Sequence, residues 1–177
     1  PMAASRPPWS TSTKSNRAGR SRAQLKSPRK LAKRGEKLKV PMPTALVLGG
    51  YGLIGSACCR ALAGAGFRVV GAGRSRSAAM TSSLHQEWIF HDLSSLKTAG
   101  WTEILDGVDV VVNAAGALQE GPRDDLEAIH ATMLAQLCAA AAPNLRIVQI
   151  SAAGVSLDAS TEFFRSKARG DAHVTNA

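Results

Sequence analysis

The sequence predicts an α/β fold with a doubly wound parallel sheet. Short apolar runs alternate along the chain with segments of helical periodicity. Strands that alternate with helices form a parallel sheet, because each helix returns the chain to start the next strand in the same direction. The fourth run is rich in β-branched residues, which suits a central strand buried on both faces. The five runs are 45–48, 67–72, 87–92, 109–113 and 145–150.

A glycine-rich turn follows the first predicted strand. Gly49 permits a sharp turn, Gly52 lets the backbone approach a pyrophosphate, and Gly55 lets the next helix pack tightly. The free N–H groups of that helix's first turn would then face the phosphates. A strand, a glycine turn, a helix and a second strand within about 30 residues indicate a Rossmann-type dinucleotide-binding unit. The alternative is a glycine-rich loop between unrelated elements.

The helix after this turn is expected to bury one apolar stripe and to end at Gly66, which is placed as a C-cap. The predicted stripe consists of Ile54, Ala57, Cys58, Ala61, Leu62 and Ala65.

Two motifs resemble those of the short-chain dehydrogenase/reductases, in their extended or atypical branches. These branches include nucleotide-sugar epimerases and NAD(P)H-binding proteins related to a complex I accessory subunit. The first motif is the glycine loop GGYGLIG, and the second is the N-x-A-G motif at the end of the fourth strand. The resemblance implies that both motifs contact the dinucleotide. Their residues are Gly49, Gly50, Tyr51, Gly52, Leu53, Ile54 and Gly55, then Asn113, Ala114, Ala115 and Gly116.

The end of the second strand predicts the cofactor preference. An NAD site usually has an acid here, about 20 residues after the glycine loop, but the nearest acid is Glu87. Arg74 takes this place, with Arg76 behind it, and a guanidinium suits a 2′-phosphate. We therefore expect NADP(H) to bind in preference to NAD(H). The alternative is that both arginines are solvated loop charges.

A weak helix is expected at 78–85, followed by a third strand that ends in Asp92. The resemblance implies that Asp92 and Leu93 lie beside the adenine. Asp92 could equally cap the next helix, which carries Leu96, Trp101, Ile104 and Leu105, and both roles are compatible.

A long helix is predicted from Asp124 to about Ala141, with Asp124 and Asp125 at its positive end. Pro143 ends it before the fifth strand. Its apolar face is expected to be core, and comprises Leu126, Ile129, Met133, Leu137 and Cys138.

The resemblance also implies catalytic positions after the fifth strand. Ser151 matches the serine that orients a substrate carbonyl, and Lys167 matches the lysine of Tyr-x-x-x-Lys, which also holds the nicotinamide ribose. Phe163 occupies the tyrosine position, and a phenyl ring has no proton to give. Ser151 could instead be a turn or cap residue, and Lys167 a solvated helix charge.

The resemblance covers Thr44 to about Asp171, the cofactor half of a family member, so we expect a sheet that is incomplete at its C-terminus. It implies an NAD(P)-dependent oxidoreductase or epimerase with an unknown small-molecule substrate. The alternative is a non-catalytic dinucleotide-binding sensor or assembly subunit. Family members often pair through helices, so a homo-oligomer is one option.

The net charge of +9 is concentrated in the first 40 residues, which carry 12 Lys and Arg and one acid. Residues 41–177 carry 10 Lys and Arg and 12 acids, which argues against nucleic-acid binding by the predicted domain at 42–177. The composition of 1–41 predicts disorder. The segment could be a transit peptide, a basic arm or, as we favour, a non-native extension before Met42.

Other classes of site find no support. The three cysteines and four histidines show no metal-ligand spacing, so no metal site is expected. The cysteines suit small core residues in a reducing compartment, and we expect a cytoplasmic protein rather than an organellar one. No apolar run reaches transmembrane length.

Overall fold

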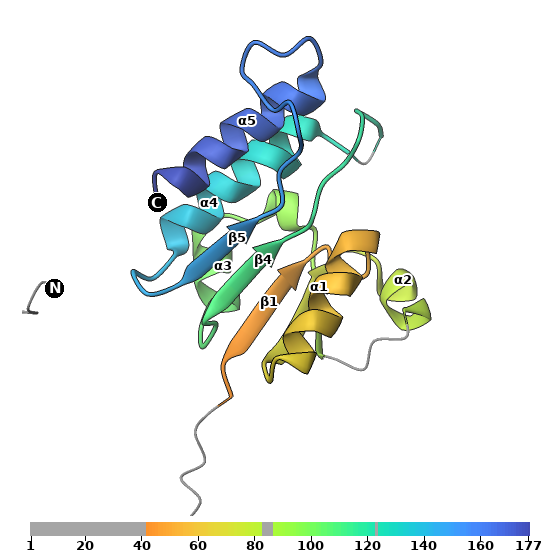
Figure 1. Ribbon diagram of the computed structural model, residues 1–177, viewed down its shortest axis with the longest axis vertical. Coiled ribbons are helices and arrows are strands. Elements are labelled where there is room, and N and C mark those ends of the chain that lie inside the picture. Colours follow the sequence, from red (N-terminus) through yellow and green to blue (C-terminus); the bar gives the residue numbers. More distant parts are fainter. Residues whose placement is uncertain (1–41, 83–86, 123) are drawn as a thin grey trace, which may run out of the picture. The chain divides into compact units, whose positions relative to one another are not determined.

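The computed structural model describes residues 42–82, 87–122 and 124–177, and these form the predicted doubly wound α/β domain (Figure 1). All strand pairs are parallel, in the order β3-β2-β1-β4-β5. The order reverses direction between β1 and β4, so the carboxyl ends of these two strands mark the switch point of the sheet. The strands are β1 (Thr44–Leu48), β2 (Arg68–Gly73), β3 (Glu87–Phe90), β4 (Val110–Asn113) and β5 (Arg146–Gln149).

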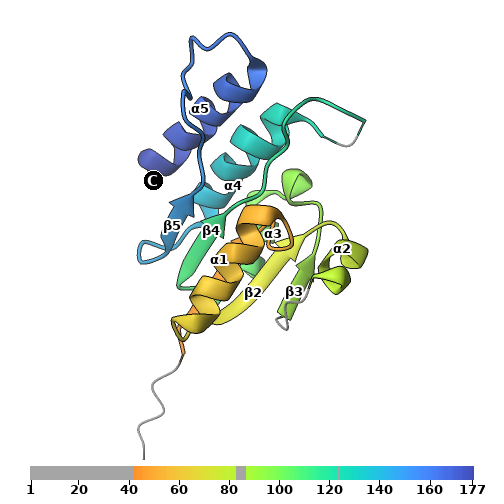
Figure 2. The same ribbon diagram turned by 45° about the vertical axis from the view of Figure 1, so that its right-hand side comes forward.

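Helices cover both faces of the sheet (Figures 1 and 2). Helix α1 packs on one face, whereas α3, α4 and α5 lie on the other, and α2 lies near β3 at the edge. A single 3₁₀ turn, η1 (Leu93–Ser95), and a π-helical turn, η2 (Ala128–Thr132), precede α3 and α4. The helices are α1 (Leu53–Gly64), α2 (Arg76–Thr81), α3 (Thr98–Ile104), α4 (Met133–Ala140) and α5 (Glu162–Thr175).

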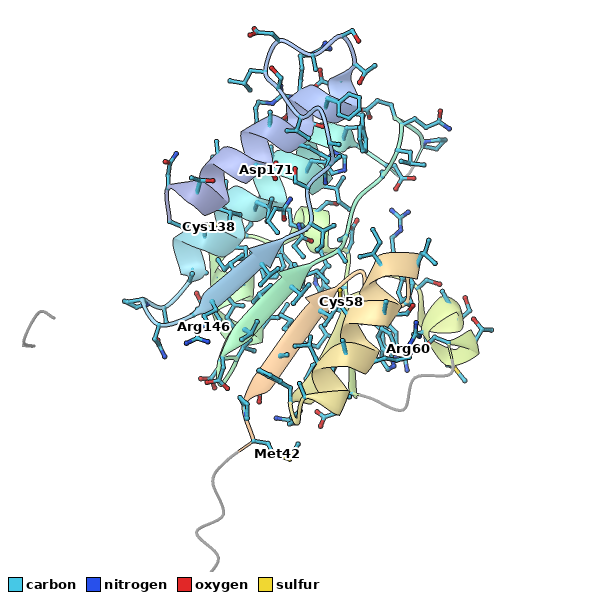
Figure 3. All side chains as sticks on the ribbon, in the orientation of Figure 1. Met42, Cys58, Arg60, Cys138, Arg146 and Asp171 are labelled. Atoms are coloured by element: carbon cyan, nitrogen blue, oxygen red, sulfur yellow. The ribbon has the colours of Figure 1, made fainter. Side chains whose placement is uncertain are left out.

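The two covered faces form two cores, which is why every residue of β1 is buried. Leu46 and Leu48 pack toward the face that carries α3 and α4, in the larger cluster. Val47 packs toward α1, with Cys59. Cys59 is buried and Cys58 and Cys138 are half-buried, as expected of core residues, and Figure 3 shows Cys58 and Cys138 on helices of opposite faces.

The predicted buried stripe of α1 is wrong in phase. Gly55 and Cys59 face the sheet, Cys58 and Leu62 are half-buried, and Ile54 is 50% exposed. The remaining predicted members are exposed, namely Ala57, Ala61 and Ala65. The reason is the close packing of Gly55 against the glycine turn, which rotates its neighbours outward.

The predicted end of α1 is confirmed. Gly66 has a left-handed φ of 88°, its N–H donates to Ala63 O, and Phe67 N–H donates to Leu62 O. These two bonds form a Schellman motif.

The third strand ends two residues earlier than predicted, at Phe90, where its pairing with β2 stops. Asp92 caps the turn η1 by accepting from Ser94 N–H, rather than capping α3, which begins after Lys97. Helix α2 begins earlier than predicted, at Arg76, and residues 83–85 of the predicted helix lie outside the described residues.

The long helix begins later than predicted. Helical backbone starts at Leu126, and the carboxylate of Asp125 caps it by accepting from Ala128 N–H at 2.8 Å. Asp124 therefore lies outside the helix. Its two backbone groups pair with Gly121 in an isolated antiparallel bridge.

The predictions for residues 1–41 lie outside the described residues. Across the three described ranges, no helix is both long and apolar enough to cross a bilayer.

Candidate functional site

A groove of about 210 Å³ lies at the carboxyl ends of the central strands. It brings together residues from the glycine turn, the end of β2, the segment after β3 and the end of β4, as a dinucleotide site at the switch point requires. Nine of the predicted site residues line it: Gly49, Tyr51, Gly52, Arg74, Asp92, Leu93, Ala114, Ala115 and Gly116. Four residues that the sequence did not single out for the site join them, namely Gly73, His91, Asp124 and Ile129.

The glycine turn forms a cradle that side chains would fill. Gly49 has φ +69°, and a Cβ there would lie 2.9 Å from the backbone of Ala115. A Cβ on Gly55 would overlap the carbonyl oxygen of Gly49. Gly52 is the N-cap of α1 and offers no side-chain cap to its first N–H groups. This open helix start suits the phosphates of a dinucleotide.

The other residues of the glycine motif hold the turn or face outward. Tyr51 is half-buried, and its hydroxyl accepts from Ser75 N–H at 3.1 Å, which ties the turn to the end of β2. Gly50 is buried below the groove and does not line it. Leu53 and Ile54 also lie outside the lining, with 90% and 50% exposure.

Arg74 reaches across the groove. Its Nη2 lies 2.8 Å from Oδ1 of Asp124, and both side chains are partly exposed. Arg76 points elsewhere, with its guanidinium 4.4 Å from the ring centre of Phe90 in a cation–π contact. Of the two arginines, only Arg74 lines the groove.

The two residues predicted beside the adenine differ in exposure. Leu93 is buried, whereas Asp92 is exposed and accepts from the N–H and hydroxyl of Ser94. Both line the groove near the end of β3.

The Asn113–Gly116 turn follows β4, so it lies across the switch point from Arg74, Asp92 and Leu93, which follow β2 and β3. Asn113 is buried, donates to Gln149 on β5 and accepts from Ala115 N–H at 3.1 Å. Asn113 therefore shapes the turn from below, while the three residues after it line the groove.

The predicted catalytic residues lie together but do not line the groove. Lys167 is buried, and its ammonium donates to the carbonyl of Ile150 at 3.0 Å. Burial lowers the pKa of Lys167, and the nearby charge of Asp171 opposes this shift. Ser151 is exposed and donates its hydroxyl to Asp171. The ring centre of Phe163 is 6.0 Å from the Lys167 ammonium.

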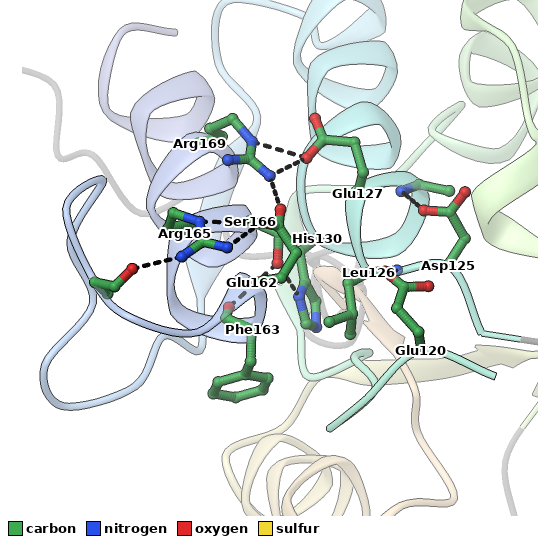
Figure 4. Close-up of polar contacts among 12 residues, drawn as sticks. Glu120, Asp125, Leu126, Glu127, His130, Glu162, Phe163, Arg165, Ser166 and Arg169 are labelled. Carbon is green, nitrogen blue, oxygen red and sulfur yellow. Dashed lines mark hydrogen bonds and ion pairs between the residues drawn. The ribbon is translucent and has the colours of Figure 1, made fainter.

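His130, which no sequence motif singled out, is buried in the π-helical turn behind the groove. Its Nε2 accepts from Ala117 N–H at 3.2 Å, and its Nδ1 is 2.9 Å from the hydroxyl of Ser166 (Figure 4). Because Nε2 accepts, Nδ1 carries the proton of the neutral ring. The ring also meets Phe163 edge-on, with 5.5 Å between the ring centres. In the sequence, the one feature that could have indicated a buried His130 is its position beside the apolar residues of this helix.

The pKa of His130 is lowered from 6.5 to about 4. Burial is the main cause, and the positive charge of Lys167 lowers the pKa further. Between these values the unfolded chain binds a proton that the folded chain does not. The resulting stability is complete above about pH 6.5 and is lost as the pH falls toward 4. It should amount to about 2 kcal/mol, since one pKa unit corresponds to about 1.36 kcal/mol and part of the shift depends on a neighbouring charge.

Urea unfolding at pH 7.5 and pH 4.5 measures this effect. We expect the wild-type chain to lose about 2 kcal/mol more than His130→Asn between the two values, since asparagine does not titrate. Equal losses in the two proteins would show that His130 does not control this pH dependence.

An ion-pair network on α5 extends to the start of the helix that follows the groove (Figure 4). Glu162 pairs with Arg165 and Arg169, and Arg169 also pairs with Glu127 at 2.6 Å. These arginines lower the pKa of Glu162, chiefly through their hydrogen bonds. Of these pairs, Arg169–Glu127 is the one that connects α5, which carries Phe163 and Lys167, to the neighbouring helix.

Within the described ranges, no three His, Cys, Asp or Glu residues lie close enough to hold a metal ion.

Solved structures share this fold. The Bordetella bronchiseptica enzyme WbmH in complex with NAD⁺ is 19% identical, with a TM-score of 0.62, over 76% of this chain and 53% of that one. A short-chain dehydrogenase/reductase superfamily protein from Agrobacterium tumefaciens with bound NAD is 22% identical, with a TM-score of 0.61, over 74% and 44%. A Shigella flexneri protein assigned to the short-chain dehydrogenases, complexed with NADP, is 18% identical, with a TM-score of 0.60, over 73% and 68%.

The chain thus spans about half the length of the first two of these proteins. The comparison with curated protein sequences gave no match. The family model for the NAD-dependent epimerase/dehydratase family matches residues 45–171, which include the glycine turn, every lining residue of the groove and Lys167. The chain therefore belongs to the NAD-dependent epimerase/dehydratase family.

Proposed function

We propose that this chain binds a nicotinamide dinucleotide across the carboxyl ends of its strands and acts as an oxidoreductase or epimerase. The observation that carries the proposal is the glycine cradle, in which Gly49 and Gly52, the N-cap of α1, line the groove. The NAD- and NADP-bound structures with the same fold support the choice of ligand. The family supports the reaction class.

In this proposal, different residues of the groove contact different parts of the dinucleotide. The glycine turn receives the pyrophosphate, Arg74 the 2′-phosphate, and Asp92 with Leu93 the adenine. The turn after β4 lies along the nicotinamide half. The proposed cofactor-binding residues are Gly49, Gly50, Tyr51, Gly52, Leu53, Ile54, Gly55, Arg74, Asp92, Leu93, Asn113, Ala114, Ala115, Gly116 and Lys167.

The proposed catalytic residues are Ser151 and Lys167, in a mechanism without the usual tyrosine. The buried Lys167 ammonium is held by the Ile150 carbonyl, and burial already lowers its pKa. The Lys167 ammonium would lower the pKa of an acidic group at position 163, but the phenyl ring of Phe163 has no proton to exchange.

A second candidate function is a non-catalytic dinucleotide-binding sensor or assembly subunit, which Phe163 favours. The hydrogen bond from Ser151 to Asp171 favours it too, because that hydroxyl is already bound to a residue that does not line the groove.

The extent of the domain, residues 42–177, remains part of this proposal. So do a small-molecule substrate of unknown identity, a homo-oligomer and a cytoplasmic location.

Calorimetric titration of the 177-residue chain with NADPH and with NADH tests the cofactor assignment. We expect NADPH to bind more tightly. Arg74→Gln should weaken NADPH binding about tenfold or more and change NADH binding little, because a charge-assisted hydrogen bond contributes about 1.5–3 kcal/mol. Arg146→Gln is the matched control, since Arg146 is exposed at the amino end of β5 (Figure 3).

The outcomes separate the parts of the proposal. If the folded chain binds neither cofactor, the proposed function is wrong. If Arg74→Gln weakens both cofactors equally, the cofactor site stands but the 2′-phosphate assignment does not.

A further inference from the structure

We infer that Asp124 is a specificity-determining residue of the groove. It lies at what we call the ribose corner, where Arg74 and Asp124 meet and the adenosine ribose would bind. There it weakens the preference for NADP(H) that Arg74 would otherwise give. The inference rests on the proposed function and adds to it a residue that neither motif contains.

The chain has no acid close to Arg74 in sequence, but the fold places one next to it in space. The nearest acid along the chain from the end of β2 is Glu87, which is occupied by Arg68 in an exposed ion pair. Asp124 comes from the loop after β4, 50 residues beyond Arg74, and its carboxylate lies 2.8 Å from the Arg74 guanidinium. Both side chains line the groove.

Asp124 is held by its own loop rather than by Arg74 alone. Its N–H and C=O exchange hydrogen bonds with Gly121, at 3.1 and 2.9 Å. On the helix side, Asp125 caps Ala128 and Glu120 accepts from Leu126 N–H at 3.1 Å (Figure 4). The backbone of Asp124 is therefore hydrogen-bonded to Gly121, and the residues that follow it are hydrogen-bonded at the helix start.

A carboxylate in this place treats the two cofactors differently. It uses the same guanidinium donors that a 2′-phosphate would need, and it repels the phosphate's charge. The free 2′-hydroxyl of NAD(H) carries no charge and can donate to a carboxylate, which is how an acid serves in NAD sites. Asp124 thus opposes NADP(H) and tolerates or assists NAD(H).

The test compares Asp124→Asn with Asp125→Asn in the full chain. Each substitution removes one negative charge from adjacent positions, but Asp125 does not line the groove and asparagine keeps its helix cap. Binding of NADPH and NADH is measured by calorimetry, and thermal unfolding confirms that each variant is folded. Asp124→Ser replaces Asp124→Asn if the latter does not fold.

We expect Asp124→Asn to bind NADPH about tenfold more tightly, from the Coulomb repulsion it removes, and NADH equally or more weakly. Asp125→Asn should change both affinities by less than about twofold. The smaller probes 2′,5′-ADP and 5′-ADP should show the same contrast, because the effect arises at the 2′-position.

An unchanged ratio of NADPH to NADH affinity in Asp124→Asn, or the same change in Asp125→Asn, would overturn the inference. Either result would leave the proposed function intact, provided that the wild-type chain binds both cofactors. If the wild-type chain is folded and binds neither, the proposed function itself fails.

Discussion

Replacing Gly170 by alanine is expected to destabilise the fold by about 3 kcal/mol, a large part of the stability of a small domain. A Cβ at this buried position of α5 would overlap the carbonyl oxygen of His130, and it would lie 3.0 Å from a methyl group of Leu134. Relief requires α5 to move away from the π-helical turn, since the obstacle is backbone. Urea unfolding at pH 7.5 measures the loss.

The matched control is Gly64→Ala at the end of α1, where a Cβ meets nothing within 4 Å. That substitution should leave stability unchanged or raise it by up to about 1 kcal/mol, because alanine favours the helix over glycine. Equal stabilities of the two variants would show that α5 does not pack closely on the π-helical turn.

Replacing Gly55 by alanine is expected to weaken both NADPH and NADH binding by about 100-fold or more. The added methyl group would collide with the carbonyl of Gly49, so the start of α1 and the turn must separate. The N–H groups proposed to face the pyrophosphate would then lose their positions, and each hydrogen bond to a charged group contributes about 1.5–3 kcal/mol. Calorimetry on the folded variant measures the loss.

The pattern across cofactors distinguishes this effect from those at the ribose corner. Gly55→Ala should affect both cofactors alike, since the pyrophosphate is common to them, whereas Arg74→Gln and Asp124→Asn should change their ratio. Gly64→Ala in the same helix should bind both as the wild type does. Undiminished affinity in Gly55→Ala would place the pyrophosphate elsewhere.

Much of this architecture follows from local patterns. The five strands, the glycine turn and the Gly66 cap depend on which residues tolerate extended or left-handed backbone, and neighbouring residues suffice to predict them. The phase of α1 was predicted wrongly because an alanine-rich helix has apolar residues on several faces. The close packing of Gly55 selected among them.

The position of Asp124 shows the limit of such patterns. The sequence predicts Asp124 as the first residue of a helix, because acidic side chains are favoured at the positive, N-terminal end of the helix dipole. In the structure Asp125 takes the capping role and Asp124 meets Arg74 across the groove. A contact between residues 50 positions apart depends on the strand order and on loop conformation, and no local pattern records either.

The sequence was therefore sufficient for the fold class, the family resemblance and most residues of the groove lining, because motif residues follow directly on their strands. Folding in three dimensions decided which acid meets Arg74 in the groove and where His130 is buried. It also decided that Lys167 is buried against the Ile150 carbonyl rather than solvated. Each of these depends on how separate elements pack against one another, and packing distances are a property of the whole domain.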